Sequence, residues 1–389
     1  MTTPLESTLL LGADGGATEI KVHAVACDER GRFALRPESA SRLYEPCEDF
    51  TPVPLDEQLA QHATRAIQLT GAERRQADQW ISAAVEAIVE VARRCGGSRV
   101  CLGIGMPGLK TPDRRGIAVI NNGPRIPDYL DRLEAALAAR GVALAGPVSE
   151  LGSDADYCGL GEQYAADGLL RDVEHAYYVG CGTGIADALK LRGELVPFDE
   201  AKDWLMKAWQ IPSSLGPTFE KLVSAKSLNE VYANLLAGRG RSAPGFPEQA
   251  AAAGEPLARG WMGTAALVLA ELIFERISTI RDGRQATAAR GPAYARLRVD
   301  HPYRGILLER VVIGQRLGLI YAEPVYREVF ADRLEAYLAA LVATLGDEQM
   351  QAALLVAPRR LRPGFLAASR LRAAPALGAA VAAAHAAGG

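Results

Sequence analysis

The sequence lacks the patterns of a protein that is stabilised by a structural metal or by disulfide bonds. Its six cysteines and five histidines are dispersed along 389 residues, with no Cys-x-x-Cys pair and no cysteine–histidine cluster. Structural zinc sites and disulfide frameworks need closely spaced thiols and imidazoles. We therefore expect neither, and we interpret most of the thiols as small buried side chains.

Charge of one sign and long apolar runs are also scarce. Charged residues make up 23% of the chain and the net charge is -3, so no nucleic-acid partner is expected. The first residues do not resemble a signal peptide, and no apolar run approaches the length of a membrane span. The composition predicts a cytoplasmic globular protein with no membrane partner, long enough for two domains.

Glycines between two apolar segments mark a hairpin near the start of the sequence. Strands are predicted over Ser7–Ala13 and Ile20–Ala26, with Asp14, Gly15 and Gly16 in the turn between them. A Walker loop or a dinucleotide fingerprint needs a helix after its glycines, and here a strand follows. The N–H groups of such a hairpin can bind phosphate while Asp14 holds hydrated magnesium. A tight hairpin without a ligand is the alternative.

A second strand, turn and strand of the same kind occurs in the second half. Strands predicted over His175–Val179 and Ile185–Leu191 flank the turn Gly182–Gly184. Two such hairpins predict two related α/β domains with a cleft between them. We place an N-terminal domain over residues 1–149 and a C-terminal domain over residues 150–389.

A carboxylate stands between these hairpins, at the predicted junction of a strand and a helix. The strand is predicted over Val142–Val148, and the helix is predicted from Ala155, with Gly152, Ser153 and Asp154 as N-cap candidates. α/β folds carry out their chemistry just outside the carboxyl ends of their strands. Asp154 is therefore a candidate for chemistry, although a role as helix cap alone would also explain it.

Two further turns follow predicted strand ends. Gly105–Gly108 follows the strand Arg99–Ile104 and brings backbone close to a neighbour, although a simple β-turn explains it equally. Asn121 and Asn122 follow the strand Ile117–Ile120. Their amides can bond vicinal hydroxyls, or they can be ordinary turn residues.

The remaining segments are assigned from hydrophobic periodicity and composition. Residues 36–56 are proline-rich and predicted as an irregular surface segment, and residues 282–295 as a polar loop. The alanine-rich tail beyond Arg372 is predicted to be frayed or loosely helical. The predicted helices are Gln58–Gln68, Ala72–Arg94, Ile126–Arg140, Lys202–Trp209, Phe219–Leu236, Leu257–Arg281 and Arg327–Leu345, and a late strand is Leu307–Ile313.

In this order the motifs resemble the ROK family of sugar kinases, within the superfamily of actin and hexokinase ATPases. The resemblance spans most of residues 8–345. Asp14-Gly-Gly-Ala-Thr-Glu-Ile-Lys21 is similar to the family's DxGGTxxK, GIGMPG to its GxPG segment, and SELGSDADYCGLGE to its NDANAAALGE. The last of these puts Asp154 on the catalytic aspartate. Gly182-Thr183-Gly184 resembles the second phosphate motif, and Val311–Gly318 the adenosine-side segment.

The resemblance implies a two-domain actin-like ATPase fold of the ribonuclease H type, with an interdomain cleft. It also implies ATP and Mg²⁺ as cofactors, Asp154 as general base, a small sugar-like acceptor and a homodimer. The residues that it implies for nucleotide and phosphate are Asp14 (with magnesium held through water), Gly15, Gly16, Thr18, Lys21, Gly182, Thr183, Gly184, Gly314 and Gln315. Those that it implies for the acceptor are Gly108, Asn121, Asn122, Ser153, Asp154 and Glu220, the last from the likeness of Gly216–Ser224 to the family's GCLExxxS.

Departures from the family pattern bear on the acceptor. The GEIGH segment and the CxCGxxGC zinc loop have no counterpart, and VPFDEAKDWLMKAWQIPSS stands there instead. Ser153 replaces an asparagine, Asp187 a glycine, and Gln315-Arg316 a glycine pair. We therefore expect a remodelled pocket for a seven-carbon cyclitol or an aminosugar, phosphorylated on a primary hydroxyl. An ordinary hexose or aminohexose kinase and a non-catalytic sugar-binding scaffold are the alternatives. A repressor is not expected, because the first hairpin leaves no room for a preceding helix-turn-helix arm.

Overall fold

The chain is organised as two compact units. The computed structural model describes residues 8–97, 99–243, 245–283 and 290–388. The first unit comprises Met1–Gly168 and Ala373–Gly389, and the second comprises Leu169–Arg372. The boundary predicted after residue 149 therefore lies inside the first unit, which also takes back the end of the chain. The helix that starts at Asp154 thus belongs with the first glycine hairpin, and not with the second as predicted.

The first unit is built on a six-stranded sheet in the order β3-β2-β1-β4-β7, with β8 also paired to β4. Its strands are β1 (Leu9–Gly15), β2 (Glu19–Cys27), β3 (Phe33–Leu43), β4 (Arg99–Met106), β7 (Ala143–Leu144) and β8 (Leu151–Ser153). The predicted glycine hairpin is confirmed, because β1 and β2 pair antiparallel; Ser7, its predicted first residue, lies outside the described residues. β1, β7 and β8 all pair with β4 in the parallel direction.

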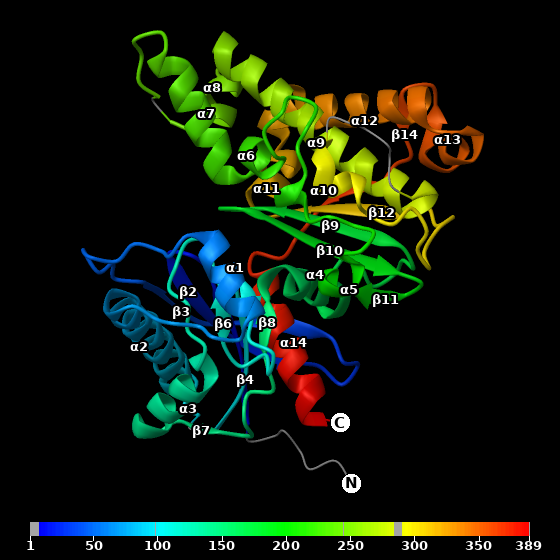
Figure 1. Cartoon of the computed structure of the whole chain (residues 1–389). Helices are drawn as coiled ribbons and strands as arrows, with labels where there is room; N and C mark the ends of the chain where they lie inside the picture. Colours follow the sequence, from blue (N-terminus) through cyan, green and yellow to red (C-terminus); the bar gives the residue numbers. More distant parts are fainter. Residues whose placement is uncertain (1–7, 98, 244, 284–289, 389) are drawn as a thin grey trace. The chain divides into compact units, whose positions relative to one another are not determined.

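Helices cover both faces of this sheet (Figure 1). They are α1 (Leu55–Ala63), α2 (Gly71–Arg94), α3 (Tyr129–Ala139), α4 (Asp154–Tyr164) and α14 (Ala374–Gly388). α2 begins at a capping box formed by Thr70 and Glu73, and its apolar stripe shares one core with Leu11 and Ala13 of β1. Because side chains alternate along a strand, Gly12 faces the opposite side. α14 lies on that side.

α14 packs directly on bare backbone. Gly12 and Gly103 are neighbours on β1 and β4, and a Cβ atom added at either would lie 1.8 Å from a carbonyl oxygen of α14, that of Ala376 or Ala379. Only glycine permits this approach. The prediction of a frayed tail beyond Arg372 is therefore wrong, because this tail is a largely buried helix. Its run of alanines has no amphipathic stripe, and only the facing glycines identify its partner.

We expect Gly103→Ala to lower the free energy of unfolding by about 3 kcal/mol, because the added methyl overpacks a contact between a strand and the backbone of α14. Urea unfolding would measure the loss. Gly146→Ala is the matched control, since a Cβ atom there meets nothing within 4 Å. Equal stability of the two variants would contradict the packing of α14 on Gly103.

Two strand predictions in the first unit are also revised. Residues 36–43 were predicted as irregular, but they belong to β3, and Ser39–Leu43 pair with β2. The register shifts next to Pro37, and β3 is an edge strand, where a proline is tolerated. Of the strand predicted over Val142–Val148 only Ala143–Leu144 forms a strand, β7, and β8 begins later, at Leu151.

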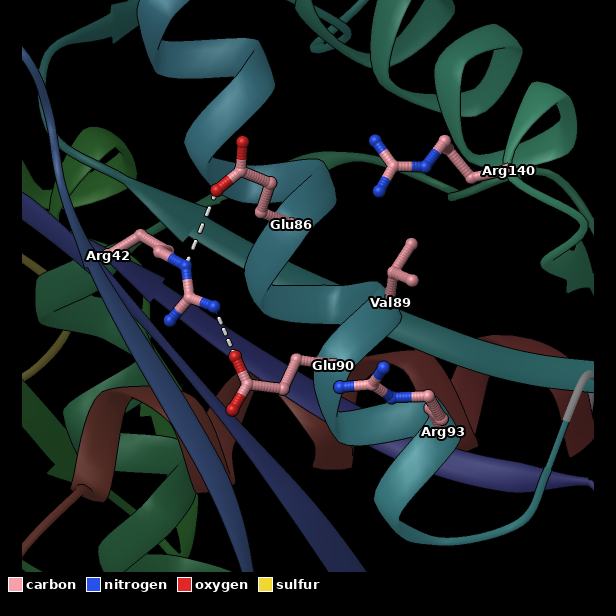
Figure 2. A pocket seen from close by; sticks show the side chains of 6 residues that line it. All are labelled: Arg42, Glu86, Val89, Glu90, Arg93 and Arg140. Carbon is pink, nitrogen blue, oxygen red and sulfur yellow. Dashed lines mark hydrogen bonds and ion pairs between the residues drawn. The ribbon is translucent and has the colours of Figure 1, made fainter.

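A shallow hollow of about 270 Å³ lies between β3, α2 and the end of α3 (Figure 2). Arg42 contacts both Glu86 and Glu90 across it. Its lining residues are Arg42, Glu86, Val89, Glu90, Arg93 and Arg140.

The second unit repeats the strand order of the first. Its sheet has the order β11-β10-β9-β12-β15, with β9 (Ala176–Cys181), β10 (Ile185–Leu191), β11 (Glu194–Val196), β12 (Arg310–Gly314) and β15 (Leu366–Ala368). As in the first unit, the first hairpin strand pairs antiparallel with the second and parallel with a later strand. This shared order supports the predicted relation between two α/β halves, and the cleft predicted between them stays a prediction.

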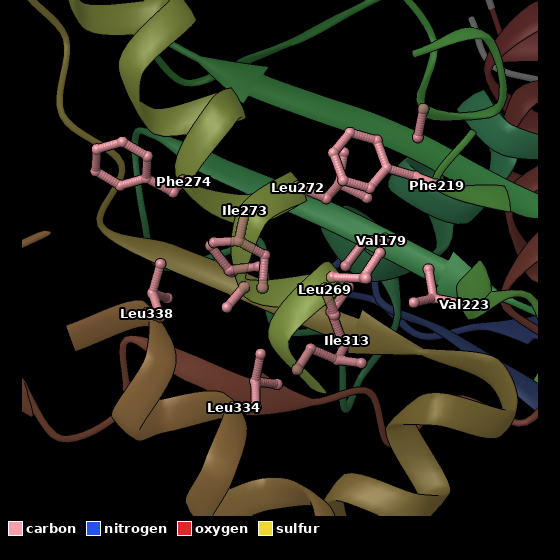
Figure 3. Packing of buried hydrophobic residues seen from close by; sticks show 14 of the residues in the cluster. Val179, Phe219, Val223, Leu269, Leu272, Ile273, Phe274, Ile313, Leu334 and Leu338 are labelled. Carbon is pink, nitrogen blue, oxygen red and sulfur yellow. The ribbon is translucent and has the colours of Figure 1, made fainter. Parts of the chain in front are cut away.

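The core of the second unit is organised by α9 (Pro256–Asp282). Figure 3 shows Leu269 and Ile273 of this helix among Val179 and Ile313 of the sheet and Leu334 of α12. By length and composition α9 could cross a membrane, yet 67% of its apolar stretch is buried inside the protein. The other helices are α5 (Phe198–Ala201), α6 (Glu220–Val223), α7 (Ala225–Ala237), α8 (Pro247–Ala252), α10 (Gly291–Ala295), α11 (Gln315–Ala322), α12 (Asp332–Leu345) and α13 (Glu348–Leu354).

Three predictions in the second unit are revised. The helix predicted over Lys202–Trp209 is mostly irregular, since Trp204 stacks on His301 at 4.1 Å and this tertiary contact overrides helical propensity. The helix predicted over Phe219–Leu236 breaks at Ser224, which caps α7. Of the loop predicted over residues 282–295, residues 284–289 lie outside the described residues and its end forms α10.

Candidate functional site

Two aspartates meet at one edge of the first sheet. Asp14 near the end of β1 is the neighbour of Gly105 on β4, and Gly105 is the neighbour of Gly152 on β8. Asp154 follows two residues after Gly152 and begins α4. The N-cap of α4 is Ser153, whose hydroxyl accepts a hydrogen bond from a backbone N–H at 3.4 Å, so capping does not explain Asp154. β1, β4 and β8 run parallel, and both aspartates thus lie at the C-terminal ends of these strands.

The electrostatics of Asp14 reflect this arrangement. Loss of solvation and then the neighbouring Asp154 carboxylate raise the pKa of Asp14 from 3.8 to about 7, against the opposing effect of Lys21. Lys21 is the cross-strand neighbour of Asp14, but its ammonium pairs with Glu19 at 2.8 Å. A divalent cation would relieve the repulsion between the two carboxylates, so this pair fits magnesium. The described residues contain no group of three or more metal-binding side chains, so Mg²⁺ would take its direct ligands from water and phosphate, and Asp14 would bind it through that water.

We expect Asp14→Asn to stabilise the fold increasingly as pH rises. The folded pKa lies above the unfolded one, so the carboxylate costs stability as pH rises from about 4 to 7. Allowing for solvent screening, we expect a gain of about 2 kcal/mol at about pH 8 that vanishes near pH 4. Thermal unfolding of both proteins across this range would measure it. A difference that is independent of pH would contradict the raised pKa.

The first hairpin leaves two backbone N–H groups for a ligand. The N–H of Gly16 is used in closing the turn, because it donates to Glu19 O at 2.8 Å. In the described part of the chain, the N–H groups of Ala17 and Thr18 have no such partner. Gly15 is fixed by packing, since a Cβ atom there would lie 1.9 Å from Met106 Sδ. The backbone donors open to a ligand therefore lie one or two residues after the predicted pair Gly15–Gly16.

The turn after β4 is held by a lysine that the sequence analysis did not single out. Lys110 Nζ donates to Met106 O at 2.6 Å and to Gly108 O at 2.9 Å. Gly108 has φ +89°, and a Cβ atom there would lie 2.3 Å from Val119 O, so this position requires glycine. The sequence signal that could have identified this role is the position of Lys110, two residues after Pro107-Gly108 on the strand that leaves the turn.

Buried polar side chains fix the loop that carries Asn121 and Asn122, and both asparagines are exposed. Before them, Gln58 accepts from Ile120 N at 2.8 Å and donates to Ile120 O at 2.9 Å. After them, Arg125 is fully buried. Its guanidinium donates to Glu73 Oε1 and Oε2, each at 2.8 Å. Nothing in the local sequence of these residues distinguishes them from ordinary surface residues, so only the tertiary fold identifies their role.

We expect Glu73→Gln to cost about 3 kcal/mol of unfolding free energy, because it leaves the buried Arg125 without its counter-charge. Glu57→Gln is the control: Glu57 is exposed and accepts a hydrogen bond from Gln61 at 3.1 Å, so we expect a change within about 0.5 kcal/mol. Urea unfolding compares the two variants. A similar loss for both would show that the Arg125 pair does not fix this loop.

The second unit contains a glycine hairpin of the same design. The N–H of Gly182 donates to Gly184 O at 3.0 Å, and that of Ile185 to Glu220 Oε2 at 2.9 Å. Within the described residues, the N–H groups of Thr183 and Gly184 have no partner. Glu220, predicted to contact the acceptor, therefore lies against the second hairpin. Each glycine hairpin exposes two consecutive backbone donors.

The segment predicted to bind adenosine lies beside this hairpin. Gly314 neighbours Gly180 on β9, and Gln315 begins α11 with φ 55°, a left-handed conformation that is uncommon outside glycine. A Cβ atom added at Gly182 would lie 2.2 Å from Gln315 Oε1, so the glutamine side chain covers this glycine. Arg316 instead pairs with Glu248 at 2.8 Å.

The structure thus groups the predicted site residues by unit. One edge of the first sheet gathers Asp14, Gly15, Gly16, Thr18, Lys21, Gly108, Ser153 and Asp154. Asn121 and Asn122 follow Ile120, against whose Cβ Gly108 packs. The second unit gathers Gly182, Thr183, Gly184, Glu220, Gly314 and Gln315. The hollow in Figure 2 contains none of these residues.

Comparison with known proteins identifies the fold. No family model matches the sequence, and no curated protein matches it. A candidate sugar kinase from Cytophaga hutchinsonii matches with a TM-score of 0.58 and 15% identity, over 96% of this chain and 98% of that one. A ROK-family glucokinase from Streptomyces griseus, in complex with glucose and AMPPNP, matches with a TM-score of 0.56 and 16% identity, over 97% and 99%.

A ROK-family transcriptional regulator, a homologue of the Escherichia coli MLC protein, matches with a TM-score of 0.56 and 12% identity, over 97% of this chain and 78% of the regulator. The chain therefore has the α/β fold of the ROK sugar kinases, which confirms that part of the fold prediction. At these identities the likeness concerns the fold alone.

Proposed function

We propose that the protein is an ATP-dependent kinase that phosphorylates a hydroxyl of a sugar or of a sugar-like cyclitol. The observation that carries the proposal is the pairing of Asp14 with Asp154 at the carboxyl ends of β1 and β8. A fold shared with sugar kinases supports it, as do two hairpins with free backbone donors.

Each carboxylate has a separate role in this proposal. Asp154 accepts the proton of the acceptor hydroxyl as that oxygen attacks, which is the task of a general base in phosphoryl transfer. Asp14 holds Mg²⁺ through water, and Lys21 lies beside it as the cross-strand neighbour. When bound, ATP would supply the phosphoryl group and Mg²⁺ would neutralise its negative charge.

Phosphate binding falls to backbone groups. The free N–H groups of Ala17 and Thr18 bind phosphate oxygens from the first unit, and those of Thr183 and Gly184 do so from the second. Gly15 and Gly16 shape the first turn, Gly182 the second, and Gly314 and Gln315 contact the nucleoside. Such preorganised donors need no rearrangement when charge develops on the phosphoryl group.

The acceptor is held by Gly108, Asn121, Asn122, Ser153 and Glu220 in this proposal. The segment that stands in place of the family's histidine and zinc loop favours a non-standard polyol, a seven-carbon cyclitol or an aminosugar, phosphorylated on a primary hydroxyl. An ordinary hexose or aminohexose is the alternative acceptor. We also propose a cytoplasmic homodimer.

We expect ATP and Mg²⁺ to give acceptor-dependent ADP release with one member of a panel of hexoses, aminohexoses and seven-carbon cyclitols. Asp154→Asn should lower kcat by about 1,000-fold with little change in KM, because the base acts in the transition state. Asp156→Asn, on the same helical turn, is the control and should stay active. A near-normal rate for Asp154→Asn would overturn the assignment, and ATP binding without turnover on any acceptor would favour a sugar-binding scaffold.

A further inference from the structure

A buried carboxylate lies just beyond the second glycine hairpin. Asp187 is 3% exposed on β10, two residues after Ile185. Its Oδ2 accepts a hydrogen bond from Ala208 N at 2.8 Å, and its Oδ1 accepts one from the Tyr177 hydroxyl. Arg276 Nη2 is 3.3 Å from the same Oδ1. The carboxylate therefore reaches from the strand to a backbone amide of the segment that departs from the family pattern.

Arg276 connects Asp187 to a wider buried network. The guanidinium of Arg276 is fully buried and also pairs with Glu275 at 2.9 Å. Glu275 Oε1 in turn accepts from Thr279 Oγ1 at 2.8 Å and from the Tyr294 hydroxyl at 3.1 Å. Buried charges are tolerated only when they are paired and hydrogen-bonded. The network thus holds Asp187 in one fixed position.

The segment held by Asp187 leads directly to Glu220. After Ala208 the chain turns back on itself, with Phe219 N donating to Ile211 O at 3.1 Å and Ser213 N to Pro217 O at 2.9 Å. Glu220 follows this loop and accepts from Ile185 N at 2.9 Å. The loop 208–220 is therefore attached to β10 at both ends, through Asp187 at its start and through Glu220 at its end.

We propose that Asp187, held by Arg276, is a positioning residue that sets the carboxylate of Glu220 on the second hairpin. Glu220 occupies the N–H of Ile185, so that Thr183 and Gly184 are the donors left for phosphate. Without Asp187 the amide of Ala208 loses its acceptor, and the loop that ends at Glu220 is released at its start. This role rests on the proposed kinase function, in which Glu220 also contacts the acceptor.

A double-mutant cycle tests this coupling. Asp187→Ala and Glu220→Ala, which remove the acceptor oxygens, should each lower kcat/KM for the acceptor by about tenfold or more, and the double variant should be no worse than Glu220→Ala alone. A merely structural role for Asp187 would make the two losses multiply, and that result would overturn the proposal. Asp347→Asn is the control, because it removes an ion pair with Arg281 elsewhere in the second unit and should leave kcat/KM unchanged.

Hydrogen exchange tests the same coupling without any activity. Asp187→Ala should speed exchange of the Ile185 amide about tenfold, as Glu220→Ala should, whereas Asp347→Asn should not. Unchanged protection of Ile185 would overturn the positioning role. If protection falls but the parent protein shows no acceptor-dependent ADP release, the positioning role stands and the kinase function fails.

Should Asp187→Ala fail to fold, Asp187→Leu combined with Arg276→Met and Glu275→Gln removes both ion pairs of Arg276 without leaving a buried charge. The amide of Ala208 still lacks an acceptor in this variant. It should therefore fold and show the same faster exchange at Ile185, and normal protection would overturn the proposal.

Discussion

The first unit depends on the parallel alignment of β1, β4 and β8, and that alignment depends on bare glycines. Asp14, Gly105 and Gly152 are successive neighbours across these strands, so Asp154 emerges next to Asp14. On the face away from α2, Gly12 and Gly103 let the backbone of α14 lie on β1 and β4. The end of the chain thereby supports the strands whose ends carry the candidate site.

The fold holds like charges together at a cost in stability. Burial of Asp14 beside Asp154 disfavours its ionised form at neutral pH. A carboxylate pair placed only for stability would not be kept in this state, whereas one that awaits a divalent cation would be. If the proposed Mg²⁺ binds beside this pair, relief of the repulsion would contribute to its affinity, and its binding would release a proton from Asp14.

Local patterns predicted both hairpins, the start of α4 to within one residue and the long helices α2 and α9, because glycine turns, caps and apolar stripes are visible within a few residues. Features that depend on distant partners escaped prediction. α14 carries alanines whose partners are glycines about 275 or more residues earlier. Lys202–Trp209 has a helical pattern that a stack on His301 overrides. Gln58, Lys110 and Arg125 are recognised only once their acceptors are in place.

The residues that depart from the family pattern are replacements that contact one another's surroundings beside the second hairpin. Asp187 replaces a glycine and bonds Ala208, which lies in the segment that replaces the histidine and zinc loop. Gln315 replaces a glycine but keeps a glycine-like φ of 55° and covers Gly182. In both places a side chain fills space beside the second hairpin that glycine would leave open. Changes that fit one another in this way are what the proposed remodelling of the acceptor pocket would require.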